Sequence, residues 1–372
     1  MTPLRLVLAQ NTPGHSWTGM GRWAHETAAA LRGRGHTVSL WFSEDFPRRV
    51  TAGRLSVLRY PSALGRRLVR ERASFDAAII HEPAGRRYGR ARRADPSLPP
   101  LLLMCHNLEA EVFATLRDAA ALGFARVSLG QRLKTPLVRL PQSRDAIRLA
   151  DHVLCLSQRD RRALVERWGL PGTRVTAFVN GAPAVVPRRP PSGPPTVLFV
   201  GGWLDVKGRR VLPPLWTLVS ERMPGARLTL VGTGRSGPEV LSEFPPSVRG
   251  TVTVMQRVER VQAMADLFAR HHVLVMPSLS EGSPLTLLEA MAAGVPVAAA
   301  AVGGIPDIVR HEATGILFPT CDSRAAGEAV LRLLTDRNLS EALANLAQRE
   351  VQQHTWGGVA KAIEHAVAAV RT

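Results

Sequence analysis

Residues 277–298 (PSLSEGSPLTLLEAMAAGVPVA) constrain the fold of this chain most strongly. They overlap an apolar run at 271–278 that is typical of a buried parallel strand, and they continue into a helical pattern that ends at Gly294. The junction at 282–284 (GSP) therefore lies at a helix start, where unpaired N–H groups and the positive end of the dipole favour a phosphate. This order of elements predicts a parallel α/β sheet with an anion site at its edge.

Two glutamates flank this junction. Glu281 and Glu289 stand eight positions apart, one before the helix and one inside it. Two carboxylates around a phosphate site would repel the ligand unless they faced other groups, and hydroxyls of a ribose or a sugar are suitable hydrogen-bond donors. The pattern thus predicts a sugar-nucleotide site. The simpler alternative is one glutamate at a helix N-terminus and another on the solvent face of that helix.

These residues resemble glycosyltransferase family 4 (glycosyl transferases group 1), whose hallmark E-x7-E runs here from Glu281 to Glu289. The resemblance implies the α/β GT-B fold, with two Rossmann-like domains facing across a cleft and the C-terminal helix crossing back to the N-terminal domain. It also implies transfer with retention of the anomeric configuration. Glu281 would then face the donor sugar, Glu289 the ribose, and the amides around Ser283 and Leu285 the diphosphate.

A second motif follows an apolar strand pattern at 196–200 and contains Lys207, one of only three lysines in the chain. A lysine at the carboxyl edge of a strand can offset the charge of a diphosphate leaving group. The family pattern V-G-R-L-x-x-x-K-G matches at Lys207 and Gly208, but this chain has Gly202 where the family has an arginine. Arg209 or Arg210 could replace that contact, or the grip on the donor could be weaker.

The N-terminal half carries the remaining site predictions. His81 and His106 each follow an apolar strand pattern, and His106 resembles the family's histidine near the donor sugar. The predicted catalytic residues are His106, Glu281 and Lys207. The predicted nucleotide-sugar-binding residues are Gly19, Gly21, Gly201, Gly202, Lys207, Gly232, Gly282, Ser283, Pro284, Leu285 and Glu289. No metal is expected, because the helix N-terminus and Lys207 can offset the charge of the diphosphate. No cofactor is expected either, because the nucleotide sugar is a co-substrate.

Two domains are expected from length, because 372 residues exceed one ordinary hydrophobic core. Together with the proline content and the family resemblance, this gives four predicted regions. They are an N-terminal acceptor-binding domain (1–182), a proline-rich linker (183–195), a nucleotide-sugar-binding domain (196–355) and a C-terminal helix (356–372). No apolar run is long enough to span a membrane, and the N-terminus lacks a signal-peptide pattern, so a cytoplasmic protein is expected. The three cysteines lack metal-site spacing and are expected to be buried, reduced thiols.

Positive charge is concentrated in the N-terminal half. Residues 1–188 contain 30 Lys and Arg against 14 Asp and Glu, whereas 189–372 contain 18 against 16. Leu64, Leu68 and Val69 are predicted to form an apolar stripe beside arginines, an amphipathic pattern that favours an anionic membrane surface. A solvated basic face is the alternative. Nucleic acid is not expected as a partner, since no recognition motif and few aromatic residues are present.

The sequence thus predicts a metal-independent glycosyltransferase that uses a UDP- or GDP-sugar. The expected acceptor is a glycan or lipid-linked saccharide of polysaccharide or glycolipid synthesis, with the enzyme peripheral on the inner face of the cell membrane. Three alternatives remain: a soluble small-molecule acceptor, a non-catalytic nucleotide-sugar or polyanion-binding relative, and a sugar-nucleotide epimerase of the same architecture. The E-x7-E segment favours the transferase over the epimerase.

Overall fold

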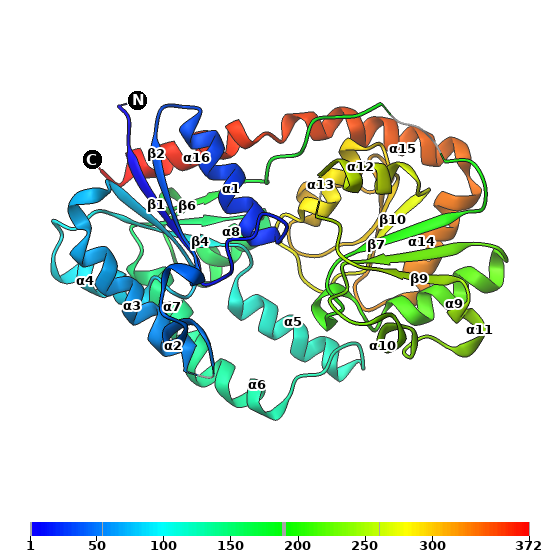
Figure 1. Cartoon of the computed structure of the whole chain (residues 1–372), viewed down its shortest axis with the longest axis horizontal. Helices are drawn as coiled ribbons and strands as arrows, with labels where there is room; N and C mark the ends of the chain where they lie inside the picture. Colours follow the sequence, from blue (N-terminus) through cyan, green and yellow to red (C-terminus); the bar gives the residue numbers. More distant parts are fainter. Residues whose placement is uncertain (1, 54, 188–190, 260, 372) are drawn as a thin grey trace. The chain divides into compact units, whose positions relative to one another are not determined.

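The computed structural model describes residues 2–53, 55–187, 191–259 and 261–371 (Figure 1). Internal contacts divide the chain into two units. Unit 1 comprises Met1–Phe113, Ser128–Gly181 and Thr355–Thr372, and unit 2 comprises Ala114–Val127 and Ala182–His354. The predicted domain boundaries stay predictions. The division assigns 114–127 to unit 2, and residues 188–190 of the predicted linker lie outside the described residues.

Unit 1 is built on a six-stranded parallel sheet in the order β2-β1-β3-β4-β5-β6. Its strands are β1 (Arg5–Ala9), β2 (Thr37–Trp41), β3 (Ala77–His81), β4 (Leu101–Cys105), β5 (His152–Cys155) and β6 (Val175–Ala177). All five residues of β4 are buried and alternate between two core clusters, one on each face of the sheet. An apolar side chain at every position is what a strand covered on both faces requires.

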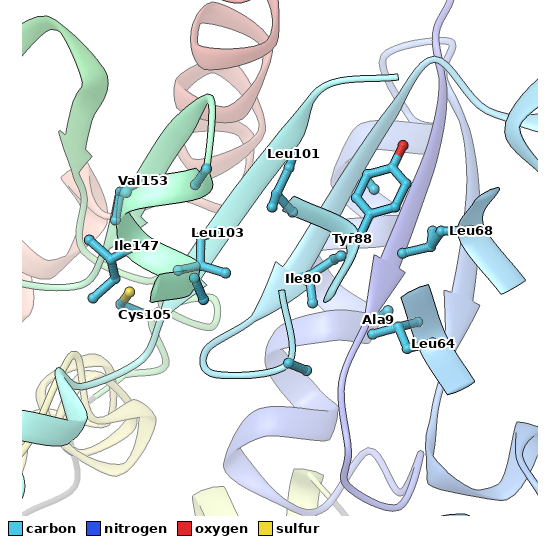
Figure 2. Packing of buried hydrophobic residues seen from close by; sticks show 14 of the residues in the cluster. Ala9, Leu64, Leu68, Ile80, Tyr88, Leu101, Leu103, Cys105, Ile147 and Val153 are labelled. Carbon is cyan, nitrogen blue, oxygen red and sulfur yellow. The ribbon is translucent and has the colours of Figure 1, made fainter. Parts of the chain in front are cut away.

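Helices cover both faces of this sheet. The helices of unit 1 are α1 (Gly19–Arg32), α2 (Arg48–Thr51), α3 (Ser56–Arg70), α4 (Arg86–Ala94), α6 (Leu129–Lys134), α7 (Leu140–Leu149), α8 (Gln158–Arg162) and α16 (Trp356–Ala369). Of these, α6 has no buried residue, and α5 (Glu109–Ala121) begins in unit 1 and continues in unit 2. A π-helical segment, η3 (Thr135–Arg139), joins α6 to α7. Figure 2 shows Leu68 of α3, Tyr88 of α4 and Ile147 of α7 packing on the side chains of Ile80 and Leu103.

The C-terminal helix α16 packs in unit 1, as the fold prediction required. Val359, Ile363 and Val367 recur every four residues and are buried in the same core cluster as residues of α1 and β1. Near its middle, Glu364 accepts hydrogen bonds from the Arg34 guanidinium (2.5 and 2.8 Å) and pairs with the His36 ring (2.8 Å). An apolar stripe and one polar anchor therefore fix the helix on the sheet.

Unit 2 contains a second parallel sheet, in the order β12-β11-β10-β7-β8-β9. Its strands are β7 (Thr196–Val200), β8 (Arg227–Val231), β9 (Val252–Met255), β10 (Val273–Met276), β11 (Val297–Ala300) and β12 (Ile316–Phe318). Its helices are α9 (Leu212–Arg222), α10 (Gly237–Leu241), α11 (Pro246–Arg249), α12 (Val261–Ala269), α13 (Leu285–Ala292), α14 (Ser323–Thr335) and α15 (Arg337–Glu350). Strand and helix alternate as the sequence predicted.

The predicted apolar stripe on α3 does not face solvent. Leu64 and Leu68 are fully buried in the core of unit 1, and Val69 packs against that core. The Arg67 guanidinium beside them stacks on the Trp41 ring, 3.9 Å from its centroid. The sequence pattern was correct, but the apolar side of α3 covers its own sheet. The assignment of this stripe to a membrane surface was therefore wrong.

Two further predictions concern burial. Cys105 and Cys155 are buried cysteines at the ends of β4 and β5, as expected, whereas Cys321 is only half-buried. Cys321 was expected in the interior but lies in a turn with a φ of 58°, where the chain runs near the surface. Among the described residues, no helix is both long and apolar enough to cross a membrane.

Candidate functional site

Two loops of unit 2 pack closely at the carboxyl ends of β7 and β10. Gly208 has a φ of 81°, and a Cβ added to it would lie 2.0 Å from the Pro277 carbonyl oxygen. The Leu279 N–H donates to the Val206 carbonyl (2.8 Å), which joins the same two loops. Only glycine allows this approach. The two residues of the Lys-Gly motif therefore have different roles. Gly208 allows the two loops to pack closely, and Lys207 supplies a positive charge.

Glu281 is held beneath this contact. Glu281 is 5% exposed. Each of its two carboxylate oxygens accepts a hydrogen bond from the Lys207 ammonium, at 2.7 and 2.8 Å. The Ser278 hydroxyl donates to the same carboxylate at 2.7 Å. A buried carboxylate with an ammonium and a hydroxyl as partners stays oriented. The structure thus brings together two of the three predicted catalytic residues, which lie 74 positions apart in the chain.

A glycine turn after β11 supports the backbone of Glu281. The Gly304 N–H donates to the Glu281 carbonyl at 3.1 Å. Gly303 has a φ of 55°, and a Cβ there would lie 1.7 Å from the same carbonyl oxygen. The sequence analysis had not assigned these two glycines a role. Their signal was the GG pair after an apolar strand, which is too common alone to indicate that it carries a site residue.

Helix α13 begins beside Glu281. Ser283 is buried, Pro284 is the N-cap residue, and no acidic side chain lies in the first turn. No carboxylate of the first turn therefore neutralises the positive end of the helix dipole, which can bind an anion. The helix ends where predicted, because Gly294 has a φ of 67° and its N–H donates to Met291 O (3.0 Å). Glu289 is half-buried, one turn into α13.

The glycine loops after β7 and β8 lie next to each other. The Gly201 N–H donates to Val231 O (3.0 Å), and the Trp203 N–H donates to Thr233 O (2.8 Å). Gly232 has a φ of 72°, so its turn needs a glycine. Gly202 has no such need, since a Cβ there would make only ordinary contacts of 3.4–3.5 Å with Leu204. The structure therefore has room for a side chain at the position where the family carries an arginine.

Arg209 and Arg210, which could replace the missing family arginine, each form an ion pair with a carboxylate. Arg209 pairs with Glu243 (2.8 Å) and Arg210 with Asp205 (3.3 Å). Each guanidinium already faces a carboxylate, so its charge is largely balanced before any phosphate arrives. Lys207 also has a carboxylate partner, but that partner is Glu281, itself a predicted site residue.

Unit 1 places His81 and His106 together at the ends of β3 and β4. Their rings lie 5.2 Å apart, and Trp23 approaches His106 edge-on at 4.8 Å. Burial lowers the pKa of His106 to about 4, and burial followed by the neighbouring His106 also lowers the pKa of His81. Both rings are therefore neutral near pH 7. His106 Nε2 is buried and has no hydrogen-bond partner within the described residues, so it can still bond a hydroxyl.

The two predicted glycines of the first loop differ. A Cβ at Gly21 would lie 2.1 Å from the His15 carbonyl oxygen, whereas a Cβ at Gly19 would meet nothing within 4 Å. The Gly21 N–H donates to the Thr18 hydroxyl (3.0 Å), which caps α1. Local packing thus explains why residue 21 is a glycine. At Gly19, by contrast, a side chain would meet no neighbouring atom.

Glu82 was missed by the sequence analysis. It follows His81, is 1% exposed and accepts a hydrogen bond from the Ser143 hydroxyl. Burial, with the charge of Glu109 second, raises the pKa of Glu82 to about 8. This carboxyl is therefore mostly protonated near neutral pH. No sequence signal distinguishes it, because a Glu-Pro pair after a strand is an ordinary turn.

Comparison with family models covers most of the chain. A model described as Glycosyltransferase Family 4 matches residues 17–184. A model described as Glycosyl transferases group 1 matches residues 194–336. The gap between the two matches lies within the proline-rich stretch, and the second match contains Lys207, Glu281 and Glu289.

Two curated relatives are similar in part. D-inositol 3-phosphate glycosyltransferase of Thermobispora bispora is 26% identical over 266 residues, which is 66% of this chain and 62% of that protein. Sulfoquinovosyl transferase SQD2 of Arabidopsis thaliana is 33% identical over 141 residues, or 37% and 27% of the two chains. The matched regions thus span less than two thirds of either relative.

Two solved structures are similar along almost the whole length. Sucrose-phosphate synthase from Thermosynechococcus elongatus has a TM-score of 0.77 at 20% identity and covers 99% of both chains. Anabaena HepE in complex with UDP and glucose has a TM-score of 0.67 at 16% identity, with 98% and 100% covered. At these identities the likeness concerns the fold.

Proposed function

Since this chain belongs to the glycosyl transferases of group 1 (family 4) and has their GT-B fold, we propose that it transfers a sugar from a nucleotide-sugar donor to an acceptor. One observation carries the proposal. Lys207 and Glu281 form a bidentate ion pair at the N-terminus of α13, between two loops whose contact requires Gly208. A pair of opposite charges at a helix N-terminus suits a ligand with a diphosphate and hydroxyls.

The roles follow from the chemistry of the groups. The Lys207 ammonium and the first-turn amides of α13 would bind the diphosphate, and their positive charge would stabilise the negative charge that develops as it leaves. Glu281 would accept hydrogen bonds from sugar hydroxyls and Glu289 from the ribose. Oε2 of Glu281 accepts only from Lys207 and keeps a lone pair for this, whereas Oε1 already accepts from both Lys207 and Ser278. His106 stays a predicted catalytic residue, with a neutral ring suited to hydroxyls.

The reaction would be retaining and would need no metal. The bond from the anomeric carbon to the phosphate oxygen breaks, and a bond to the acceptor oxygen forms on the same face. The acceptor's proton passes to the departing phosphate. In this scheme Lys207 takes the part that a divalent cation plays in metal-dependent transferases.

UDP- and GDP-sugars are the proposed donors, and HepE is described in complex with UDP and glucose. The proposed acceptor is a glycan or lipid-linked saccharide, because the basic N-terminal half would attract an anionic acceptor or membrane. The relatives are named for inositol phosphate and sulfoquinovosyl transfer, which also keeps a small-molecule acceptor as the second candidate. Cell-envelope polysaccharide or glycolipid synthesis in the cytoplasm is the proposed setting.

The decisive test is donor binding and slow donor hydrolysis with a panel of UDP-, GDP- and ADP-sugars. We expect one nucleotide class to raise the melting temperature by several degrees and to be hydrolysed slowly. Lys207→Ala and Glu289→Gln should lose both effects. Hydrolysis should persist in EDTA, and its loss there would contradict metal independence.

Matched controls are available in the same chain. Lys361→Ala removes an exposed lysine of α16, and Glu328→Gln removes a glutamate of α14 whose side chain is 44% exposed. Both should behave as the wild type does. Stabilisation without hydrolysis, even with acceptors supplied, would favour a non-catalytic nucleotide-sugar-binding protein. No response to any nucleotide would overturn the proposal.

A further inference from the structure

A short helical stretch of unit 1 buries nothing. It consists of α6 and η3 (residues 129–139), continues directly into α7, and has no buried residue among its eleven. In Figure 1, α6 lies apart from the sheet of unit 1, beyond the helices that cover it. By contrast α7, its continuation, buries Ala146 and Ile147 in the core. We call residues 129–139 the exposed helix.

The exposed helix carries leucines on one side. Leu129, Leu133 and Leu137 follow one another at intervals of four residues and are 72, 57 and 74% exposed. Residues four apart lie on the same side of a helix. The stripe is thus an apolar face left open to water, which is unfavourable unless something covers it.

The exposed helix is formed locally before anything covers it. Ser128 and Gln131 form a capping box, in which the Ser128 hydroxyl accepts from the Gln131 N–H (3.2 Å) and the Gln131 side chain accepts from the Ser128 N–H (2.9 Å). Such a cap stabilises a helix N-terminus without tertiary contacts. The leucines are therefore held in place in the uncovered state.

Positive charge surrounds the stripe. Residues 128–144 contain no Asp or Glu, and they include Arg132, Lys134, Arg139 and Arg144. Within this stretch the charge of Arg139 is balanced by Glu109 (2.5 Å), and the adjacent Asp145 pairs with Arg86 (2.8 Å). The face that remains is apolar in its centre and basic at its edges.

We propose that the exposed helix docks this protein on an anionic lipid surface. The leucines would enter the boundary between headgroups and acyl chains, and the flanking basic residues would contact lipid phosphates. This names the element that would make the membrane contact, and it does not depend on the transfer reaction, since docking needs no donor. It also moves the expected membrane contact from α3, whose stripe is buried, to residues 129–139.

Two other partners fit the same face less well. A second copy of the chain would bring one basic edge against another, and like charges oppose that pairing. A nucleic acid would use the basic residues but would leave the leucine stripe exposed. Lipid with an acidic headgroup is the partner that satisfies both the apolar and the charged part.

The test measures co-sedimentation of the full chain with vesicles, without nucleotide. Vesicles of phosphatidylcholine containing phosphatidylglycerol should retain the wild type at low salt, and pure phosphatidylcholine vesicles should not. Leu133→Gln/Leu137→Gln and Arg132→Gln/Lys134→Gln should each weaken retention about tenfold. All four side chains are exposed, so the variants are expected to fold.

Matched controls distinguish binding through this face from general electrostatic attraction and from non-specific hydrophobic binding. Arg66→Gln/Arg70→Gln removes two exposed arginines of α3, and Leu204→Gln removes an equally exposed leucine of unit 2. Neither should lower retention more than about twofold, because general attraction of one or two charges is modest.

Three outcomes would overturn the proposal. In the first, the leucine pair binds anionic vesicles as well as the wild type does. In the second, the α3 arginine pair lowers retention as much as the Arg132/Lys134 pair, which would make net charge the cause. In the third, light scattering finds a dimer that the leucine pair abolishes, with no vesicle binding by the wild type. Loss of donor hydrolysis alone would leave the docking result unaffected.

Discussion

At the scale of single residues, two glycines and one lysine explain how the candidate site holds its shape. Gly208 and Gly303 each allow a backbone approach that a Cβ would block, at Pro277 and at Glu281. Lys207 then reaches the Glu281 carboxylate. Lys207 and Glu281 belong to two separate sequence motifs. Neither motif shows that the two side chains are hydrogen-bonded to each other.

The residue that departs from the family pattern gives a testable prediction. Gly202→Arg should fit, because a Cβ at this position meets only Leu204 at 3.4–3.5 Å. The new guanidinium would add a charge-assisted contact to the diphosphate, and we expect the donor's Kd to fall about tenfold. Isothermal titration with the donor identified above measures it.

Gly250→Arg is the matched control, because it adds the same charge to unit 2 at a glycine with nothing within 4 Å of an added Cβ. It should leave the Kd unchanged. An equal gain in both variants would point to net charge, and weaker binding by Gly202→Arg would contradict a phosphate contact at this position.

At the scale of elements, amphipathic helices with similar patterns end in opposite surroundings. The apolar side of α3 is buried on the sheet, and that of α16 is buried beside α1, whereas the leucines of residues 129–139 face solvent. Each pattern has leucines or other apolar residues at intervals of about four. The pattern therefore fixes which residues share a side, and the neighbours of the helix decide what that side meets.

The anchor of α16 predicts a pH-dependent stability. Hydrogen bonds from Arg34, and then from His36, lower the pKa of Glu364 to about 2 from an ordinary value of 4.5. The unfolded chain binds more protons between these two values, so this stabilisation is present above pH 4.5 and is lost as the pH falls towards 2. Glu364→Gln should lower the free energy of unfolding by about 2–3 kcal/mol at pH 7, and by roughly half of that or less at pH 3.

Denaturant unfolding at both pH values measures this difference. The control is Glu328→Gln, whose salt bridge with Arg222 is exposed on both sides and should contribute little. A loss of the same size at pH 3 and pH 7 would show that the carboxylate charge is not the cause.

At the scale of the whole molecule, the predicted site residues share one kind of position. Those of unit 2 follow β7, β8 and β10, and those of unit 1 follow β1 and β4, so all lie beyond carboxyl ends of parallel strands or at the helices that follow. Parallel α/β sheets bind ligands at this edge, because helix N-termini and glycine turns gather there.

Hydrogen exchange can test this arrangement along the entire chain. A nucleoside diphosphate of the preferred base should slow exchange in segments 201–208, 232–235 and 278–285 of unit 2. Segments at the opposite ends of the strands, such as 223–226 and 294–296, serve as internal controls and should not change. Protection at the opposite ends alone would place the nucleotide elsewhere and contradict the assigned site.

The sequence by itself determined the parallel α/β class, the end of α13 at Gly294, and the glutamates and lysine of the motif. These features depend on residues near one another in the chain, so periodicity, glycine turns and helix caps reveal them. Only the tertiary structure decided that Lys207 bonds Glu281, that Gly303 supports Glu281, and that Glu82 is a buried neutral carboxyl. It also decided that the leucines of α3 are covered while Leu129, Leu133 and Leu137 are not. Each of these depends on segments distant in the sequence, and burial is a property of what surrounds a side chain rather than of the pattern that carries it.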